Sequence, residues 1–217
     1  MSESDNLFAP RFSIKDVTIH KKERVYKQFF AMDRYEVSYK QFSGGESKVL
    51  VREIFERDAD AVAVLVWDEK TDEVALIEQF RPGALKDPES PWLIEIVAGI
   101  IDKGESCEQT AIREVKEEIG IDLKPEDLCF ITSEYPSPGG ISEMVTLYVA
   151  KADLSNLGNH GGLEIESEDI RVFKAKLDDA YENVMNGRIH NSVAIIAIMN
   201  LKWEKAKIVK RLQNNKN

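Results

Sequence analysis

Residues 99–121 read GIIDKGESCEQTAIREVKEEIGI, and this stretch decides the fold and the chemistry of the 217-residue chain. Seven positions in it stand at fixed spacings: Gly99, Glu105, Arg113, Glu114, Glu117, Glu118 and Gly120. From average residue usage, seven such identities meet in one window by chance roughly once in 10^8 windows, and a chain of this length offers about 10^2 windows. Chance therefore does not explain the pattern.

The middle of this stretch predicts a helix with a defined start and stop. Ser106 followed by Gln109 is a capping box, and Gly120 suits a left-handed stop after Ile119. Apolar residues recur inside it at helical spacing: Ala111, Ile112, Val115 and Ile119. One face of the helix is therefore expected to pack on a core.

The opposite face of the predicted helix gathers negative charge. Glu114, Glu117 and Glu118 stand at i, i+3 and i+4, which brings their side chains together. Like charges so placed destabilise a helix unless cations lie among them, and oxygen ligands select hard ions such as Mg²⁺ or Mn²⁺. Such ions would activate water and neutralise charge on a phosphoryl group.

Flanking residues separate this interpretation from a solvated acidic helix face, which three clustered glutamates alone would favour. Arg113 precedes Glu117 by four residues and can hold its carboxylate, and Glu105 can do similar supporting work. Gly99 and Gly120 have no reason to accompany a merely solvated face. The spacing as a whole therefore favours a metal-dependent pyrophosphate hydrolase.

At every position the segment resembles the Nudix box, G-x5-E-x7-R-E-U-x-E-E-x-G-U with U aliphatic. Nudix enzymes hydrolyse a nucleoside diphosphate linked to another group. The resemblance implies an α/β fold, the Nudix α/β/α sandwich with a mixed sheet, and makes Glu114, Glu117 and Glu118 metal ligands. It gives a supporting role to the other box residues: Gly99, Glu105, Arg113 and Gly120.

Segments outside the box are similar to the bacterial ADP-ribose pyrophosphatase subfamily of this family. They include the pair Phe29-Phe30 and residues 51–57, 76–81, 95–99, 135–143 and 166–170. One departure is Val97, where many relatives have proline. The activity implied is cleavage of ADP-ribose to AMP and ribose 5-phosphate with Mg²⁺, or Mn²⁺, as cofactor.

The same resemblance implies roles for individual residues. Glu166 would be the catalytic base, with Glu118 also catalytic, and the Ala98 carbonyl and Glu168 would complete the metal ligands. The substrate-binding set would be Phe29, Phe30, Arg52, Glu53, Arg57, Arg81, Ile100, Ser137 and Glu143. An aromatic side chain of the phenylalanine pair would stack on adenine across a dimer interface.

Two alternatives stay open at this point. Several sugar-nucleotide pyrophosphatases share the Pro-Gly loop found here at residues 138–140, so GDP-mannose and related nucleoside diphosphate sugars are possible substrates. A non-catalytic Nudix-like sensor of ADP-ribose is the second alternative. Such sensors tend to have eroded boxes, whereas every acid of the box is present here.

Composition excludes several classes of function. The net charge of -10 argues against a nucleic-acid surface, which would show a basic stripe. The sequence has no run of eighteen apolar residues that would predict a membrane span. The first residues lack the layout of a signal peptide, so we expect a cytoplasmic protein. Cys107 and Cys129 have neither disulfide nor zinc spacing, and we expect both to be reduced.

The chain is predicted to have two parts, residues 1–58 and residues 59–217. Residues 13–56 alternate as β-strands do, with a turn at Gly44-Gly45, and form a small antiparallel unit with little core of its own. In the resembled subfamily this unit is exchanged between two subunits, so we expect a homodimer with a swapped N-terminal part.

The larger part is predicted to alternate strands and helices. Apolar runs at 61–67 and 74–80 predict a buried hairpin, and 92–97 a strand that delivers Gly99. Further strands are expected at 128–133, 144–150 and 170–174, and helices at 178–186 and 192–212. The Gly-rich, acidic segment 156–168 is expected to be a lid.

Overall fold

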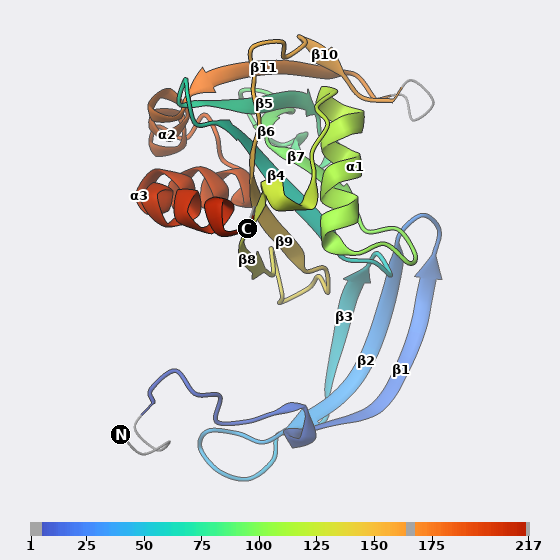
Figure 1. Cartoon of the computed structure of the whole chain (residues 1–217). Coiled ribbons are helices and arrows are strands. Elements are labelled where there is room, and N and C mark those ends of the chain that lie inside the picture. Colours follow the sequence, from blue (N-terminus) through green and yellow to red (C-terminus); the bar gives the residue numbers. More distant parts are fainter. Residues whose placement is uncertain (1–5, 164–167, 216–217) are drawn as a thin grey trace. The chain divides into compact units, whose positions relative to one another are not determined.

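The structure, a computed structural model, describes residues 6–163 and 168–215 (Figure 1). Its residues group into two compact units. The N-terminal unit comprises the described residues up to Asp58 together with Ser137–Glu143, and the large unit comprises Ala59–Pro136 and the described residues from Met144 onward. The chain therefore passes between the units after Asp58 and again on each side of residues 137–143.

The N-terminal unit is a three-stranded antiparallel sheet in the order β1-β2-β3. Its strands are β1 (Val17–Lys27), β2 (Ala31–Tyr39) and β3 (Leu50–Glu56), preceded by a 3-10 turn at Ile14–Asp16. Gly44 and Gly45 take the left-handed backbone (φ 93° and 76°) in the connection from β2 to β3, as the sequence predicts. β1 is exposed along its whole length, so this sheet has little core.

Two features of the N-terminal unit differ from the expectation. Phe29 and Phe30 lie in the turn between β1 and β2 rather than within a strand, because the first hairpin reverses at residues 28–30. Residues 137–143 belong to this unit through β3: Phe55 donates its backbone N–H to the Gly140 carbonyl at 2.8 Å, and Ile141 bridges to Phe55.

The large unit is built on an eight-stranded mixed sheet in which the path β10-β11-β5-β4-β9-β8 is flanked by β6 on β5 and β7 on β4. Only the β4–β9 pairing is parallel within it. The strands are β4 (Ala61–Asp68), β5 (Glu73–Phe80), β6 (Trp92–Glu95), β7 (Val97–Ile100), β8 (Leu128–Glu134), β9 (Val145–Lys151), β10 (His160–Gly161) and β11 (Ile170–Lys176).

The predicted hairpin of β4 and β5 is present, but the two strands are paired only next to their connecting turn. Only Trp67↔Val74 and Asp68↔Glu73 pair, and the strands then diverge. β6 fills in against β5 and β7 against β4, so the single strand predicted at residues 92–97 is two strands that break at Ile96. All residues of β4 are buried, which is what a continuous apolar run predicts for a central strand.

Helices cover both faces of this sheet (Figure 1). They are α1 (Cys107–Ile119), α2 (Leu177–Met185) and α3 (Ser192–Asn214), with 3-10 turns at Pro82–Ala84 and Pro125–Asp127. Val115 of α1 belongs to the same buried apolar cluster as Val64 and Ile77 on one face, while residues of α2 and α3 belong to the cluster on the other face. The arrangement is the α/β/α sandwich with a mixed sheet and a separate N-terminal antiparallel sheet expected from the sequence.

α3 is kinked at Glu204, whose φ of -110° and ψ of 15° leave the helical region. Its buried side includes Ala194, Ile198 and Leu201, which close the core on that face of the sheet. None of the described helices has both the length and the apolar character that a membrane crossing requires.

Candidate functional site

The site is organised by α1, which begins and ends where the sequence predicts. The Ser106 hydroxyl accepts from the Gln109 N–H while the Gln109 side chain accepts from the Ser106 N–H, and Gly120 ends the helix at φ 72°. A cap of this kind typically contributes about 1 kcal/mol. The apolar side of α1 is fixed on the sheet, which holds the three glutamates of its other side in place as a group, here called the acidic ridge (Glu114, Glu117 and Glu118).

Glu118 is the most constrained member of the acidic ridge. It is 3% exposed, and its buried Oε2 finds no hydrogen-bond partner among the described residues. Burial, reinforced by the charges of Glu114 and Glu168, holds the pKa of Glu118 well above its ordinary value. A buried carboxylate without a partner is costly, so this position needs a cation to be stable in its charged form.

Glu114 lies against the strand that carries Gly99. A Cβ at Gly99 would overlap the Glu114 carboxylate, so the absence of a side chain on β7 makes the space that this carboxylate occupies. Burial raises the pKa of Glu114 to about 7, against the opposing effect of Arg113 and with help from the charges of Glu117 and Glu168. Gly99 is therefore required by packing against an acidic side chain.

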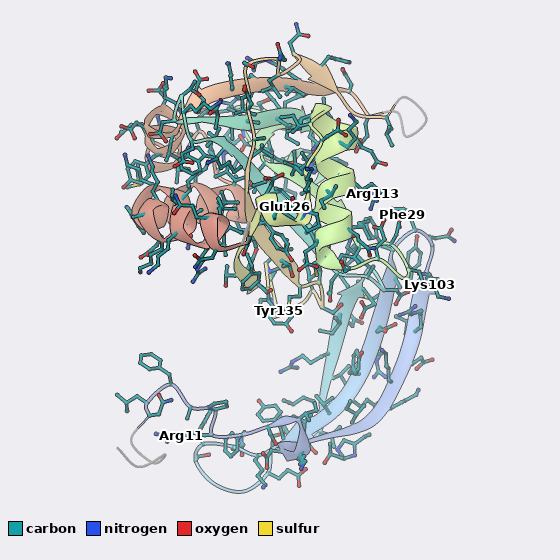
Figure 2. All side chains as sticks on the ribbon, viewed as in Figure 1. Arg11, Phe29, Lys103, Arg113, Glu126 and Tyr135 are labelled. Carbon is teal, nitrogen blue, oxygen red and sulfur yellow. The ribbon has the colours of Figure 1, made fainter. Side chains whose placement is uncertain are left out.

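Arg113, labelled on α1 in Figure 2, pairs with two members of the acidic ridge. It donates to Glu114 at 2.7 Å and to Glu117 at 2.9 Å. Its other nitrogens reach Glu105 at 3.1 Å and the Ile100 carbonyl at 3.2 Å. The pKa of Glu105 lies below its ordinary value, chiefly because the Arg113 guanidinium donates hydrogen bonds to it and next because Thr110 does. Arg113 and Glu105 thus orient the ridge, as the spacing suggested.

The donor set of the ridge fits a hard divalent cation. No group of three or more His, Cys, Asp or Glu side chains in the described part of the chain converges closely enough to hold an ion as it stands. The unpartnered Glu118 Oε2 and the raised pKa values of Glu114 and Glu118 are nevertheless what an excess of buried carboxylate over cation produces. Oxygen ligands of this kind select Mg²⁺ or Mn²⁺.

Arg81 leaves the end of β5 on the same side of the sheet as α1. Its guanidinium contacts Glu95, with Nη2 to Oε2 at 2.8 Å, and Gln79 donates to the same carboxylate at 3.2 Å. Burial would lower the pKa of Arg81, but Glu95, with the charges of Glu118 and Glu168, raises it overall. The negative charge of Glu118 in the acidic ridge therefore also acts on Arg81.

β10 lies over the end of α1. A Cβ at Gly161 would overlap the Glu118 carbonyl oxygen, so β10 lies directly on the backbone of the acidic ridge. Gly162 is left-handed (φ 91°) and packs on Glu168. The charge of Glu168 acts on Glu114 and Glu118, whereas Glu166, the base implied by the resemblance, lies outside the described residues.

The remaining substrate-binding residues of the sequence analysis lie in the N-terminal unit. They are Phe29, Phe30, Arg52, Glu53, Arg57, Ser137 and Glu143. Phe29, labelled in Figure 2, is 76% exposed, and its ring meets the Phe30 ring edge-on with 4.7 Å between the ring centres. Arg57 pairs with Glu143 and lies 5.5 Å from the Phe30 ring centre, and its buried Nε has no partner among the described residues.

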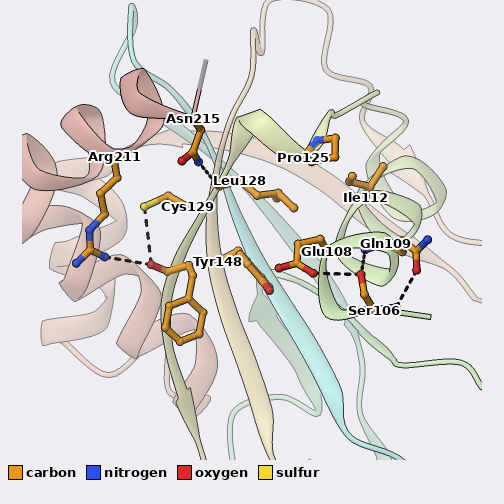
Figure 3. A pocket seen from close by; sticks show the side chains of 11 residues that line it. Ser106, Glu108, Gln109, Ile112, Pro125, Leu128, Cys129, Tyr148, Arg211 and Asn215 are labelled. Carbon is orange, nitrogen blue, oxygen red and sulfur yellow. Dashed lines mark hydrogen bonds between the residues drawn. The ribbon is translucent and has the colours of Figure 1, made fainter. Parts of the chain in front are cut away.

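A groove of about 910 Å³ lies elsewhere on the large unit, between the start of α1, β8 and the end of α3 (Figure 3). Arg211 and Asn215 donate across it to the carbonyls of Phe130 and Leu128 on the edge strand β8, at 3.3 and 2.9 Å. None of the acidic ridge residues lines it. The side chains on its wall cover the open edge of the sheet, and we assign it no ligand.

Comparison with known proteins decides the family. The NUDIX domain profile matches residues 57–186, which include the whole box and most of the large unit. The chain belongs to the Nudix family of hydrolases. The family expected from residues 99–121 is therefore confirmed.

Individual relatives resemble this Nudix hydrolase over most of its length. An ADP-ribose pyrophosphatase of Haemophilus influenzae is 39% identical over 91% of both chains. A GDP-mannose pyrophosphatase of Cronobacter sakazakii is 31% identical over 69% of this chain and 76% of its own. A crystal structure of an ADP compounds hydrolase superposes with a TM-score of 0.64 at 23% identity, covering 90% of this chain and 98% of that one, which supports the fold.

Three residues near the ridge of this Nudix hydrolase were not expected from the sequence: Gln79, Glu95 and Gly161. Glu95 carries a signal in hindsight, because it is the one acid within the apolar run 92–98, and a charged residue in such a run requires a buried partner. Gly161 has no such signal, since its contact with Glu118 joins residues far apart in the sequence.

Proposed function

We propose that this Nudix hydrolase cleaves the pyrophosphate bond of ADP-ribose to give AMP and ribose 5-phosphate. The observation that carries the proposal is the buried Glu118 carboxylate beside Glu114 on α1, whose Oε2 has no hydrogen-bond partner in the described part of the chain. The similarity to an ADP-ribose pyrophosphatase along nearly the whole chain supports the choice of substrate.

The metal ligands in this proposal are the Ala98 carbonyl, Glu114, Glu117, Glu118 and Glu168. When bound, Mg²⁺ or Mn²⁺ would polarise the phosphoryl oxygens and lower the pKa of a water molecule. Arg113 hydrogen-bonds Glu117 and Glu105, and in this proposal these contacts support the carboxylates that would bind the ion. Removal of metal by EDTA is expected to abolish turnover, and Mg²⁺ or Mn²⁺ to restore it; turnover that survives in EDTA would contradict the metal assignment.

The base in this proposal is Glu166, on the resemblance alone. A base acts in the transition state, so Glu166→Gln is expected to lower kcat far more than it raises KM. Steady-state kinetics with ADP-ribose measure both. An equal loss in KM would make Glu166 a substrate contact instead.

The substrate contacts in this proposal come from both units. Arg81 and Ile100 belong to the large unit, and the exposed residues of the N-terminal unit would bind the nucleoside half, with Ser137 and Glu143 at the distal ribose. Exposed aromatic rings such as Phe29 suit stacking on a base, which is worth about 1–3 kcal/mol.

We also propose that the chain is a homodimer in which the N-terminal units are exchanged. β1 exposes Ile19, Val25 and Tyr26 on a sheet with little core, and exposed apolar surface of this kind is typical of an interface. Light scattering after gel filtration measures the oligomeric state, and a monomer at working concentration would refute this part.

Exchange is tested by mixing two impaired variants, Arg52→Ala in the N-terminal unit and Glu118→Gln in the large unit, and by assaying well below KM, where each variant alone has little activity. If the units serve each other's sites, every mixed dimer has one intact site, and random reassortment restores activity to about a quarter of wild type. If each chain serves its own site, no mixed dimer has an intact site and activity stays at the level of the variants.

GDP-mannose is the second candidate substrate, favoured by the similarity to a GDP-mannose pyrophosphatase. A turnover screen over ADP-ribose, GDP-mannose, NADH and diadenosine polyphosphates, with products identified by mass, separates the two. A kcat/KM that is highest for ADP-ribose supports the proposal, and a higher value for GDP-mannose overturns it. The same reaction in ¹⁸O-labelled water identifies the phosphorus that is attacked.

A further inference from the structure

The cluster of Gln79, Arg81 and Glu95 lies on the face of the sheet that α1 covers. Ile77 and Gln79 of β5 share a face with Arg81, which follows the strand in extended backbone at the same step of two, and Glu95 of β6 stands directly opposite Ile77. Ile77 is part of the apolar core beneath α1. Three polar side chains therefore extend a hydrophobic layer toward the acidic ridge.

The cluster has a buried end and an accessible end. Gln79 is 6% and Glu95 8% exposed, whereas the Arg81 side chain keeps 42% of its surface open. Glu95 accepts from Arg81 Nε and Nη2 and from Gln79 Nε2, so its carboxylate is held on two sides. The buried Glu95 carboxylate therefore holds the Arg81 guanidinium in a fixed position.

The hydrogen bonds use only one edge of the Arg81 guanidinium. Nε and Nη2 face Glu95 at 3.0 and 2.8 Å, and no described residue accepts a hydrogen bond from Nη1. A guanidinium has five N–H groups in a rigid plane, so fixing the Nε–Nη2 edge also fixes the direction of the Nη1–Nη2 edge. That second edge matches the oxygens of a phosphate in a bidentate way.

The free edge lies within electrostatic range of the ridge. The charges of Glu118 and Glu168 act on Arg81 in addition to that of Glu95. A diphosphate bound through cations on the ridge would therefore lie near an arginine that is already oriented. Preorganisation of this kind lowers the entropy cost of binding, which a freely rotating arginine would incur.

We propose that Glu95, assisted by Gln79, is a positioning residue that clamps Arg81 so that its Nη1–Nη2 edge binds a phosphoryl oxygen of the diphosphate. This inference rests on the proposed function, in which the substrate is a nucleoside diphosphate compound. A plain structural ion pair between β5 and β6 is the competing explanation. It predicts lower thermal stability on loss of Glu95 without a specific loss of substrate affinity.

The test is a double-mutant cycle of Glu95→Gln and Arg81→Ala, in the full-length chain. Glu95→Gln is expected to raise KM about tenfold and to change kcat less than about threefold, because uniform binding of ground and transition states is lost. In the Arg81→Ala background the same substitution is expected to change KM less than about twofold, because Glu95 acts only through Arg81. An equal effect of Glu95→Gln in both backgrounds, or no effect in wild type, overturns the proposal.

Glu78→Gln is the matched control. Glu78 is the neighbour of Gln79 on β5 but faces the other side of the sheet, where it accepts from Arg171 and Arg188 at 2.6 and 2.9 Å. Its loss breaks a comparable ion-pair cluster away from the ridge, so KM is expected to stay within about twofold of wild type while thermal stability falls. A tenfold rise in KM for Glu78→Gln would favour the structural explanation and overturn the specific role of Glu95.

Two further measures keep the outcome decisive. If Glu95→Gln does not fold, Glu95→Asp replaces it in the cycle, since it keeps the charge but withdraws the carboxylate by one methylene. The cycle is run on whichever compound of the substrate screen wild type cleaves fastest. A wild type that cleaves another nucleoside diphosphate would refute ADP-ribose as substrate and still leave the Glu95–Arg81 coupling open to measurement, so the two failures are distinguishable.

Discussion

The two units of this chain bury different kinds of side chain. In the described N-terminal unit only Ala31, Asp33 and Ser38 are buried, and Asp33 is held by Arg24 and Lys22. The large unit has two apolar cores, one on each face of its sheet, and buries the acid Glu118 on α1, which packs on one of them. The large unit can therefore hold an unfavourable charge such as Glu118, because its apolar packing offsets the cost, whereas most side chains described in the N-terminal unit are at least partly exposed.

This contrast predicts that substitutions in the acidic ridge act on kcat and metal binding, and that substitutions in the N-terminal unit act on KM. The largest effect is expected for Glu118→Gln. Removing a preorganised charge at phosphoryl transfer should lower kcat by on the order of 10²-fold or more. Thermal unfolding without metal should be unchanged or shifted upward, because a buried unpaired charge is lost. A rate near wild type would remove Glu118 from the ligand set.

The next largest effect is expected for Gly99→Ala. The new Cβ meets only the end of a flexible side chain, so Glu114 can turn away and the fold survives. Displacing this carboxylate should raise the Mg²⁺ concentration needed for half-maximal activity by about 10–100-fold. Magnesium titration of turnover measures it, with Gly139→Ala, where no atom lies within 4 Å, as control. Unchanged magnesium dependence would show that Glu114 does not ligate metal.

Phe29→Ala tests the N-terminal side of the comparison. Phe29 is exposed, so its loss should leave folding intact and raise KM about tenfold, within the range of base stacking on an aromatic ring. Steady-state kinetics against Phe42→Ala, an equally exposed aromatic of the same unit, give the control. A fall in kcat at constant KM would break the division of labour between the units.

Gly161→Ala should act on stability rather than on affinity. Here the Cβ meets a backbone carbonyl, which cannot rotate away, so β10 and the end of α1 must separate. A cost of about 1–2 kcal/mol is typical of such overpacking and lowers Tm by about 2–4 °C per kcal/mol in a chain of this size. Calorimetry beside Gly158→Ala, whose nearest contact is 3.8 Å away, measures it. Equal Tm values would mean that β10 is not seated on α1.

The smallest effect is a pH dependence of the metal-free protein. Because the folded-state pKa of Glu114, about 7, lies above its ordinary value of 4.5, the folded state holds more protons than the unfolded state between these limits. The stability contributed by Glu114 is therefore fully present below about pH 4.5 and is lost as pH rises through 7. Tm should fall by a few degrees more in wild type than in Glu114→Gln between pH 5 and 8. An equal change of Tm with pH in the two proteins would show that a group other than Glu114 is responsible.

The sequence predicted the elements whose signal is local. Ser106, Gln109 and Gly120 define both ends of α1 by interactions within one helix, and the continuous apolar runs define β4 and β5. The acidic ridge was predictable for the same reason, since the helical repeat alone brings Glu114, Glu117 and Glu118 together.

Features that depend on strand pairing were not predictable. An apolar run such as residues 92–98 does not reveal that it breaks at Ile96, because that break follows from the divergence of β4 and β5. The turn position of Phe29-Phe30 depends on the β1–β2 register, and the pairing of Arg81 with Glu95 depends on the β5–β6 register. These contacts depend on which strands pair and in which register, and residue type alone does not predict that.

The loop of residues 137–143 has a consequence for protein engineering. It departs from the large unit, pairs with β3 and returns, so Phe55 and Arg57 find partners in Gly140 and Glu143 from a distant part of the chain. A fusion or truncation made at Asp58 would strip this loop of its companion strand. Grafting the selectivity of another family member onto this scaffold would require both pieces to be transferred together.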